Sequence, residues 1–342
     1  MLGRRTFMGS VAIAASLSAV VSVGMIEFAW AQQPAKRPIV AILLSRAPTT
    51  PTCGASPASL ACFMGGMRDL GYVDGKNVAF EVRYPKGDYQ ALPDLATELV
   101  RLRPAVIYTT GPGADAAANA TTTIPIIVGP GTEEALMRLA GNFAHPTGNV
   151  TGLTLISFEQ EVKCLEFLKE LAPRTTRVAV LLNPDNPRYR NYPGVLAPRG
   201  VQLGLTLIRI EARGLADLPR ALTAIAASGA NAIYVAGDPL LWGMSPGSRK
   251  VSEWALTQRL PVVSPNAQVA ADGGLLSFGT DINLLHGRAA IYVDKSLKGA
   301  KPADLPVERP SVFKLSVNTR TANALGIVIP QALLLRADEL IQ

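Results

Sequence analysis

The chain has 342 residues, of which 48% are hydrophobic and 17% are charged, a balance that excludes a mostly disordered protein. This length is enough to bury one large core or two lobes. The 33 lysines and arginines outnumber the 26 acidic residues and give a net charge of +7, but they are dispersed singly, without a basic run interleaved with aromatics. We therefore expect no nucleic-acid partner, despite the basic balance.

The N-terminus has the order of an export signal. Arg4-Arg5 precedes an apolar stretch over Val11–Ile26, and Ala29-Trp30-Ala31 places small residues at alternate positions. This order predicts a signal peptide over residues 1–31 that is cleaved after Ala31, which implies a periplasmic protein. The Arg-Arg-x-Phe-Met pattern indicates twin-arginine export, while the general secretory route stays open. The alternative of an uncleaved anchor is disfavoured because a membrane span needs about 20 apolar residues.

Beyond residue 36, short apolar runs alternate with helical patterns. This alternation predicts an α/β protein with parallel sheets covered by helices on both faces. Helices are expected over 56–71 and 88–103, and a third begins at Ser157. The predicted strands are Ile39–Leu44, Val78–Val82, Ala105–Tyr108, Ile124–Val128, Val178–Leu182, Leu205–Ile210, Ala232–Val235, Val262–Val263 and Leu275–Phe278.

Nine strands can form one large sheet or two smaller ones. Three extended segments without helical period, 145–157, 272–281 and 308–318, are candidates for a break between two sheets. If all three segments join two βα sandwiches, the protein has two lobes with a cleft between them.

The cysteines and histidines bear on redox and metal chemistry. Cys53 and Cys62 can form a bridge in an oxidising compartment, or Cys62 can be a small core residue, and the sequence leaves this open. Cys164 is interpreted as a core residue. Because His145 and His286 are the only histidines and no Cys/His cluster occurs, we expect neither a metal nor a cofactor.

Small or hydrogen-bonding residues follow the predicted strands, where ligands of open α/β sheets bind. Each of these strand ends lies beside the start of a helix, whose backbone N–H groups can receive a carboxylate. Such residues also make ordinary turns and caps. The hypothesis of a ligand site therefore depends on two sets of strand ends, one from each half of the chain, that face each other. The candidate ligand-binding residues are Ser45, Thr110, Gly111 and Gly129 in the first half and Asn183, Asn186, Asp238, Trp242 and Asn266 in the second.

Two motifs resemble those of enzymes, and neither fits well. Residues 109–117 match a dinucleotide fingerprint loosely, but they do not follow the first strand. The G-x-S-x-G pattern around Ser245 places Pro246 after the serine, and proline has no N–H for an oxyanion hole. We therefore expect no catalytic residues. A secreted hydrolase that uses Ser245 is kept as an alternative, and so is a periplasmic ligand sensor.

From Arg37 to Gln342 the chain closely resembles ABC-transporter substrate-binding proteins of the tryptophan/tyrosine-binding type. The resemblance is carried by "MRDLGYVDGKNVAFEVRYPKGDYQALPDLATELVRLRPAVIYTTG", "HPTGNVTGLT", "RVAVLLNPDNP", "GGLLSFGTD" and "YVDKSLKGAKPADLPVERPSVFKLSVN". It implies the type I periplasmic-binding-protein fold, with two Rossmann-like lobes joined by three crossings. We expect lobe 1 to comprise 37–153 with 277–310, and lobe 2 to comprise 154–276 with 311–342.

The resemblance also implies a function. Such a protein closes two lobes around a small solute, here an amino acid or a related small organic molecule, and delivers it to an ABC permease and its ATPase subunit. It is expected to act as a monomer. For an amino-acid solute, Ser45, Thr110 and Gly111 are candidate donors to the carboxylate, and Asp238 is the candidate partner of the ammonium group. Asn183 and Asn266 would bind the remaining polar atoms.

Two further features concern the solute and its surroundings. An aromatic wall for a planar solute would come from Trp242, Tyr189 or Phe158, although Trp242 can equally pack at the hinge. The sequence departs from the family at 128–134, which lacks the usual Asp after the fourth strand. It also departs at 188–204, where Pro193 and Pro198 predict a shortened or kinked helix, because an interior proline costs about 3 kcal/mol.

Overall fold

The computed structural model describes residues 37–47, 59–156, 158–190, 192, 194, 196–239 and 247–342, without the side chains of residues 59, 156 and 158. Residues 37–342 form one compact unit. The predicted signal peptide and the residues Cys53, Pro193, Trp242 and Ser245 lie outside the described residues.

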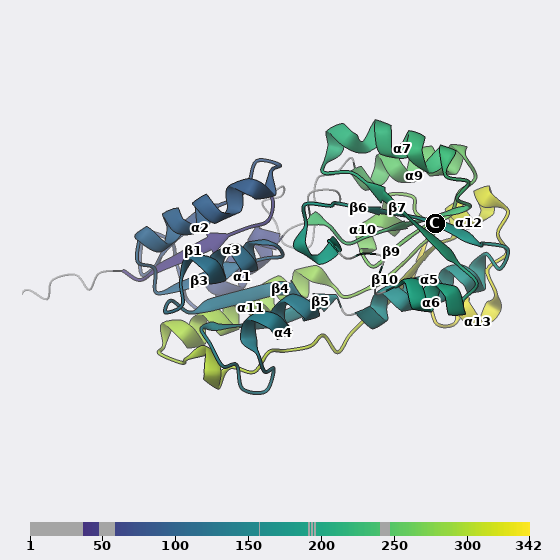
Figure 1. Ribbon diagram of the computed structural model, residues 1–342. Helices are drawn as coiled ribbons and strands as arrows, with labels where there is room; N and C mark the ends of the chain where they lie inside the picture. The colour runs from purple at the N-terminus through teal and green to yellow at the C-terminus, as the bar shows by residue number, and fades with distance from the viewer. Residues whose placement is uncertain are drawn as a thin grey trace, which may run out of the picture. The chain divides into compact units, whose positions relative to one another are not determined.

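The first sheet contains five parallel strands in the order β2-β1-β3-β4-β5 (Figure 1). Its strands are apolar along most of their length, as expected for parallel strands that are covered on both faces. They are β1 (Ile39–Leu43), β2 (Ala79–Arg83), β3 (Val106–Thr109), β4 (Ile126–Thr132) and β5 (Val150–Ile156).

Alternate residues of the first sheet face two different helical layers. Ala41 and Leu43 of β1 pack in a cluster with α2 (Leu92–Arg101), α3 (Gly113–Ala120) and α4 (Glu133–Ala140). Val40 and Ile42 pack instead with α1 (Ser59–Asp69) and α11 (Ile282–Leu297). Successive side chains of a strand point to opposite faces of the sheet, so the apolar residues of β1 contribute to the cores on both faces.

Helices α1 and α11 approach each other closely. A Cβ added at Gly66 would lie 2.7 Å from the Gly287 carbonyl oxygen, so only glycine fits at this crossing. Helix α1 ends as the sequence predicts, because Gly71 takes a φ of 90° directly after it.

The second sheet has seven strands in the order β12-β11-β10-β9-β8-β6-β7. All neighbouring pairs are parallel except β10 with β11. The strands are β6 (Arg177–Leu182), β7 (Thr206–Glu211), β8 (Ala232–Val235), β9 (Val262–Ser264), β10 (Leu276–Gly279), β11 (Lys314–Asn318) and β12 (Glu339–Ile341).

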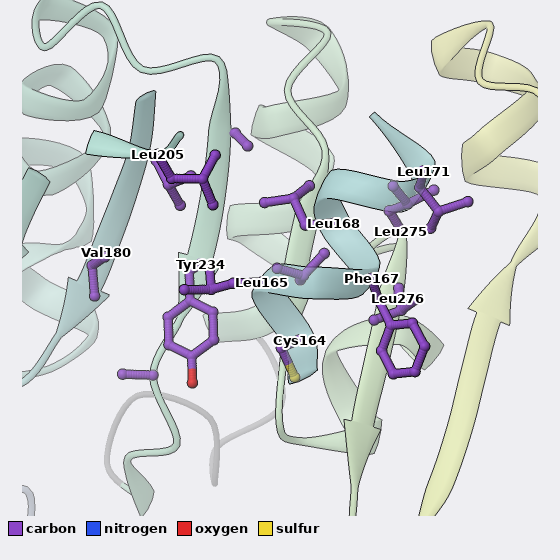
Figure 2. Close-up of a cluster of buried hydrophobic side chains, with 14 of the residues drawn as sticks. Cys164, Leu165, Phe167, Leu168, Leu171, Val180, Leu205, Tyr234, Leu275 and Leu276 are labelled. Carbon is purple, nitrogen blue, oxygen red and sulfur yellow. The ribbon is translucent and has the colours of Figure 1, made fainter. Parts of the chain in front are cut away.

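Helices cover both faces of the second sheet as well. On one face, α5 (Phe158–Leu171), α12 (Thr319–Leu325) and α13 (Gln331–Leu334) share a core with the sheet, and Figure 2 shows Leu165, Leu168 and Tyr234 in it. On the other face, α7 (Leu218–Ala227), α9 (Gly247–Thr257) and α10 (Ala267–Ala271) pack around Val235 and Val251. The short 3₁₀ turns are η1 (Tyr89–Ala91), η2 (Pro187–Tyr189), η3 (Leu215–Asp217) and η4 (Pro302–Asp304).

The chain passes between the two sheets three times: after β5, after β10, and between η4 and β11. The α/β fold with two Rossmann-like lobes and three crossings, expected from the sequence, is therefore confirmed. The sequence-based lobe boundaries, 153/154 and 276/277, fall inside β5 and β10.

The helix predicted to be shortened after Asn183 is short. Helix α6 spans only Ala197–Gln202, and Pro198 lies in its first turn, where a missing N–H breaks no helical hydrogen bond. The proline therefore begins the helix instead of kinking its interior.

Three further features of the described residues concern membrane-spanning helices, metal-binding groups and disulfides. Within the described ranges, no helix is long and apolar enough to cross a membrane. The same residues contain no group of three or more His, Cys, Asp or Glu side chains arranged to hold a metal. Cys62 is disulfide-bonded, whereas Cys164 is a free buried thiol whose hydrogen bond goes to the Phe278 carbonyl oxygen, 3.5 Å away.

Candidate functional site

A cavity of about 870 Å³ is lined by residues from both sheets. It lies at the carboxyl ends of the strands, where the strand order reverses in each sheet. In the first sheet β1 lies between β2 and β3, and in the second sheet β6 lies between β7 and β8. Ligands of open α/β sheets bind at such switch points because the helices that follow the two strands diverge to opposite faces.

Five of the predicted site residues line this cavity: Thr110, Gly111, Asn186, Asp238 and Asn266. Three others lie directly behind the wall. Ser45 is fully buried, and its hydroxyl donates to the Thr110 carbonyl oxygen. The carbonyl oxygen of Gly129 accepts a hydrogen bond from Tyr108, and the Asn183 amide donates to Asp238 over 3.4 Å.

The aromatic candidates are placed differently from the prediction. Tyr189 is fully buried in the core of the second sheet, with its hydroxyl donating to the Gly237 carbonyl oxygen over 2.9 Å, so it is not part of the cavity wall. Tyr192 lines the cavity instead. Because Tyr189 ends η2 and Tyr192 follows only three residues later, the sequence could not distinguish the inward ring from the one beside the cavity.

Asp238 is the centre of a buried hydrogen-bond cluster. Its carboxylate is 1% exposed and accepts from the Asn186 amide over 2.7 Å and from the Tyr89 hydroxyl over 3.2 Å. Tyr89 belongs to η1 and packs with the first sheet, so Asp238 joins the two walls of the cavity. A buried carboxylate at a cavity wall can interact favourably with a cationic group of a solute.

Arg46 and His286 stand together on the wall formed by the first sheet and α11. Arg46 follows β1 and is 9% exposed, and burial lowers the pKa of its guanidinium to about 10. His286 is 3% exposed; burial first, and then the charge of Arg46, lower the pKa of its imidazole to about 3. His286 is therefore neutral at physiological pH beside a positive charge.

A buried ion cluster forms another part of the wall. Arg188 of η2 lies 3.0 Å from the carboxylate of Glu161 on α5 and 2.5 Å from that of Glu134 on α4. The side chains of Arg188 and Glu161 are 8% and 1% exposed, and burial raises the pKa of Glu161. Arg188 thus connects helices that pack on different sheets.

Sequence reasoning missed Arg46, Arg188, Glu161 and His286. The arginines could have been found by position, because each follows a predicted strand end within a few residues. Glu161 and His286 lie on helices, where nothing in the apolar pattern separates a residue facing the cavity from one facing solvent.

The model of the family of ABC transporter substrate binding proteins matches residues 56–341, more than half of the chain. The chain belongs to this family. The resemblance found from the sequence is thereby confirmed. The family consists of substrate-binding proteins of ABC transporters.

Similar proteins agree with this assignment. A tyrosine-binding protein of Clostridioides difficile (strain R20291) is 24% identical over 267 residues, which are 78% of this chain and 75% of the relative. The crystal structure of a conserved domain protein from Vibrio cholerae is 27% identical with a TM-score of 0.78, and 89% of this substrate-binding protein aligns with all of that chain. A Streptococcus pneumonia ABC domain in complex with L-Trp is 24% identical with a TM-score of 0.77 and the same coverage, which shows the shared fold.

Proposed function

We propose that this chain is the exported solute-binding component of an ABC importer. Its two lobes, each consisting of one sheet with its helices, close around a small solute and deliver it to a membrane permease with its ATPase subunit. The observation that carries this proposal is a cavity lined by polar strand ends of both sheets. A solute that contacts both walls stabilises the closed form, because only that form offers both sets of contacts.

The chemistry of the walls favours an amino acid or a closely related small molecule. Asp238 supplies a buried negative charge for an ammonium group, and Arg46 supplies a positive charge for a carboxylate. Thr110 and Gly111 precede α3, and the positive end of its helix dipole favours an anionic group at this wall. The cavity volume of about 870 Å³ is within the range of sites for small organic ligands. The names of two relatives, which mention tyrosine and L-Trp, support the same class.

Export to the periplasm is part of the proposal. It is supported by the signal-peptide pattern over 1–31 and by the disulfide at Cys62, since disulfides persist in oxidising compartments. The mature protein would begin after Ala31 and act as a monomer.

Calorimetry on the mature chain with the L-amino acids and small organic acids tests the proposal. We expect at least one solute to bind, and we expect Asp238→Asn to weaken a solute that carries an ammonium group by about 10- to 100-fold, the range for a charged hydrogen bond. Asp94→Asn, on an exposed position of α2, is the matched control and should bind normally. Absence of binding across the panel, or equal affinities of the two variants, would contradict the proposal.

A further inference from the structure

His286 is hydrogen-bonded to the core of the first lobe through Nδ1, and it also lines the cavity. It lies in the first turns of α11, and its Nδ1 is 2.5 Å from the hydroxyl of Tyr108 on β3. The same hydroxyl is 2.5 Å from the carbonyl oxygen of Gly129 on β4. His286 also lines the cavity, although it is only 3% exposed.

The hydrogen-bond partners of Tyr108 determine which nitrogen of His286 carries its proton. The Gly129 carbonyl oxygen can only accept, so the single hydroxyl proton of Tyr108 must lie between these two oxygens. The Tyr108 oxygen can then bond to His286 only as an acceptor, and Nδ1 must be the donor. His286 is consequently the Nδ1–H tautomer, which leaves a free lone pair on Nε2.

The hydrogen bond to Tyr108 lies at Nδ1 of His286, and the ring is also hydrogen-bonded to the backbone of Gly129. Arg46, whose charge acts on this imidazole, lines the same wall. Burial and the charge of Arg46 oppose protonation of the imidazole more strongly than its hydrogen bond to the Gly129 backbone favours it, so the pKa is lowered. An imidazole that stays neutral in a cavity wall is an acceptor, whereas Arg46 beside it can only donate.

We propose that His286 is a specificity-determining residue of the cavity, fixed by Tyr108 and Gly129 so that its Nε2 accepts a hydrogen bond from an N–H or O–H group of the bound solute. This inference rests on the proposed solute-binding function and adds a chemical requirement to it. The wall of Arg46 and His286 selects a solute that presents an acceptor and a donor side by side. A carboxylate of the solute can bind Arg46, whereas an accepting group placed directly opposite Nε2 would face its lone pair and be disfavoured.

Nitrogen NMR of the solute-free protein labelled with ¹⁵N-histidine tests the tautomer. The chain has only two histidines, so His145→Gln assigns the spectrum without ambiguity. We expect the Nδ1–H pattern for His286 to persist from pH 8 to pH 5. An Nε2–H pattern, or a protonated ring in this range, would overturn the inference whether or not a solute is known.

Binding of the tightest solute from the amino-acid panel tests the acceptor. His286→Leu should weaken binding by about 3- to 10-fold, the range for one neutral hydrogen bond. His286→Gln, whose side-chain oxygen offers an acceptor, should recover most of this loss. Solute addition should also shift the Nε2 resonance of His286, which a purely structural residue would not show.

The outcomes separate this inference from the function on which it rests. If a solute binds, but neither His286→Leu nor the Nε2 resonance responds, the solute-binding function stands and the role of His286 is wrong. If no solute in the panel binds, the proposed function fails, and the solute-free spectrum still decides the tautomer.

Discussion

Acidification should destabilise this protein through its one buried histidine. The pKa of His286 falls from 6.5 to about 3 on folding, because of burial and the charge of Arg46. The unfolded chain therefore binds this proton first, and the stabilisation is complete above about pH 6.5 and is lost as the pH falls toward 3. Protonation of an unfolded histidine between pH 7 and pH 5 lowers the free energy of unfolding by about 2 kcal/mol.

Urea unfolding at pH 7 and pH 5, followed by far-UV circular dichroism with the disulfide intact, measures this loss. His286→Gln removes the titrating group, so between the two pH values it should lose about 2 kcal/mol less than the wild type. Leu284→Gln is the matched control, because this residue is 65% exposed on the same helix, and it should keep the wild-type loss. Equal losses in the wild type and His286→Gln would refute the reasoning.

Two further substitutions test the buried ion cluster and a backbone contact. Arg188→Met leaves the Glu161 carboxylate buried without its cation and should cost about 3–5 kcal/mol in urea unfolding. Arg336→Met, at an exposed ion pair, should cost less than about 1 kcal/mol, and similar losses for both would contradict the burial argument. Gly152→Ala should leave little folded protein by circular dichroism, because φ is 150° and a Cβ would collide with a carbonyl oxygen of β4. Gly65→Ala, which has open space, should fold normally, and normal folding of both alanine variants would show that the contact can relax.

The fold was largely predictable because its parallel strands are buried on both faces. Strands such as β6 and β8 consist of continuous apolar residues, a pattern that solvent-exposed segments rarely show. The strands that were not predicted differ physically. β5 contains Gly152 next to polar threonines, β11 alternates polar and apolar residues, and β12 has only three residues, so their pairing depends on neighbours far away in the sequence.

The position of the candidate site was predictable, but its electrostatics were not. Strand ends meet at one edge of a parallel sheet, and this rule placed Thr110, Asn186 and Asp238 at the cavity. The rule gives no information on which helix returns to cover that edge. Helix α11 follows the second sheet in sequence yet brings His286 to the first, and only the three-dimensional structure shows this.

The return of α11 has a consequence for the order in which the polypeptide can fold. One face of the first sheet is covered by Leu285, Ala289 and Val293, which the ribosome adds only after all of β6 to β10. A nascent chain that ends before α11 covers this face only with α1 and exposes the remainder to solvent, so the first lobe cannot complete its core during most of translation. Folding of this lobe is therefore a late event, and the mature three-layer arrangement becomes available only when nearly the whole chain has been synthesised.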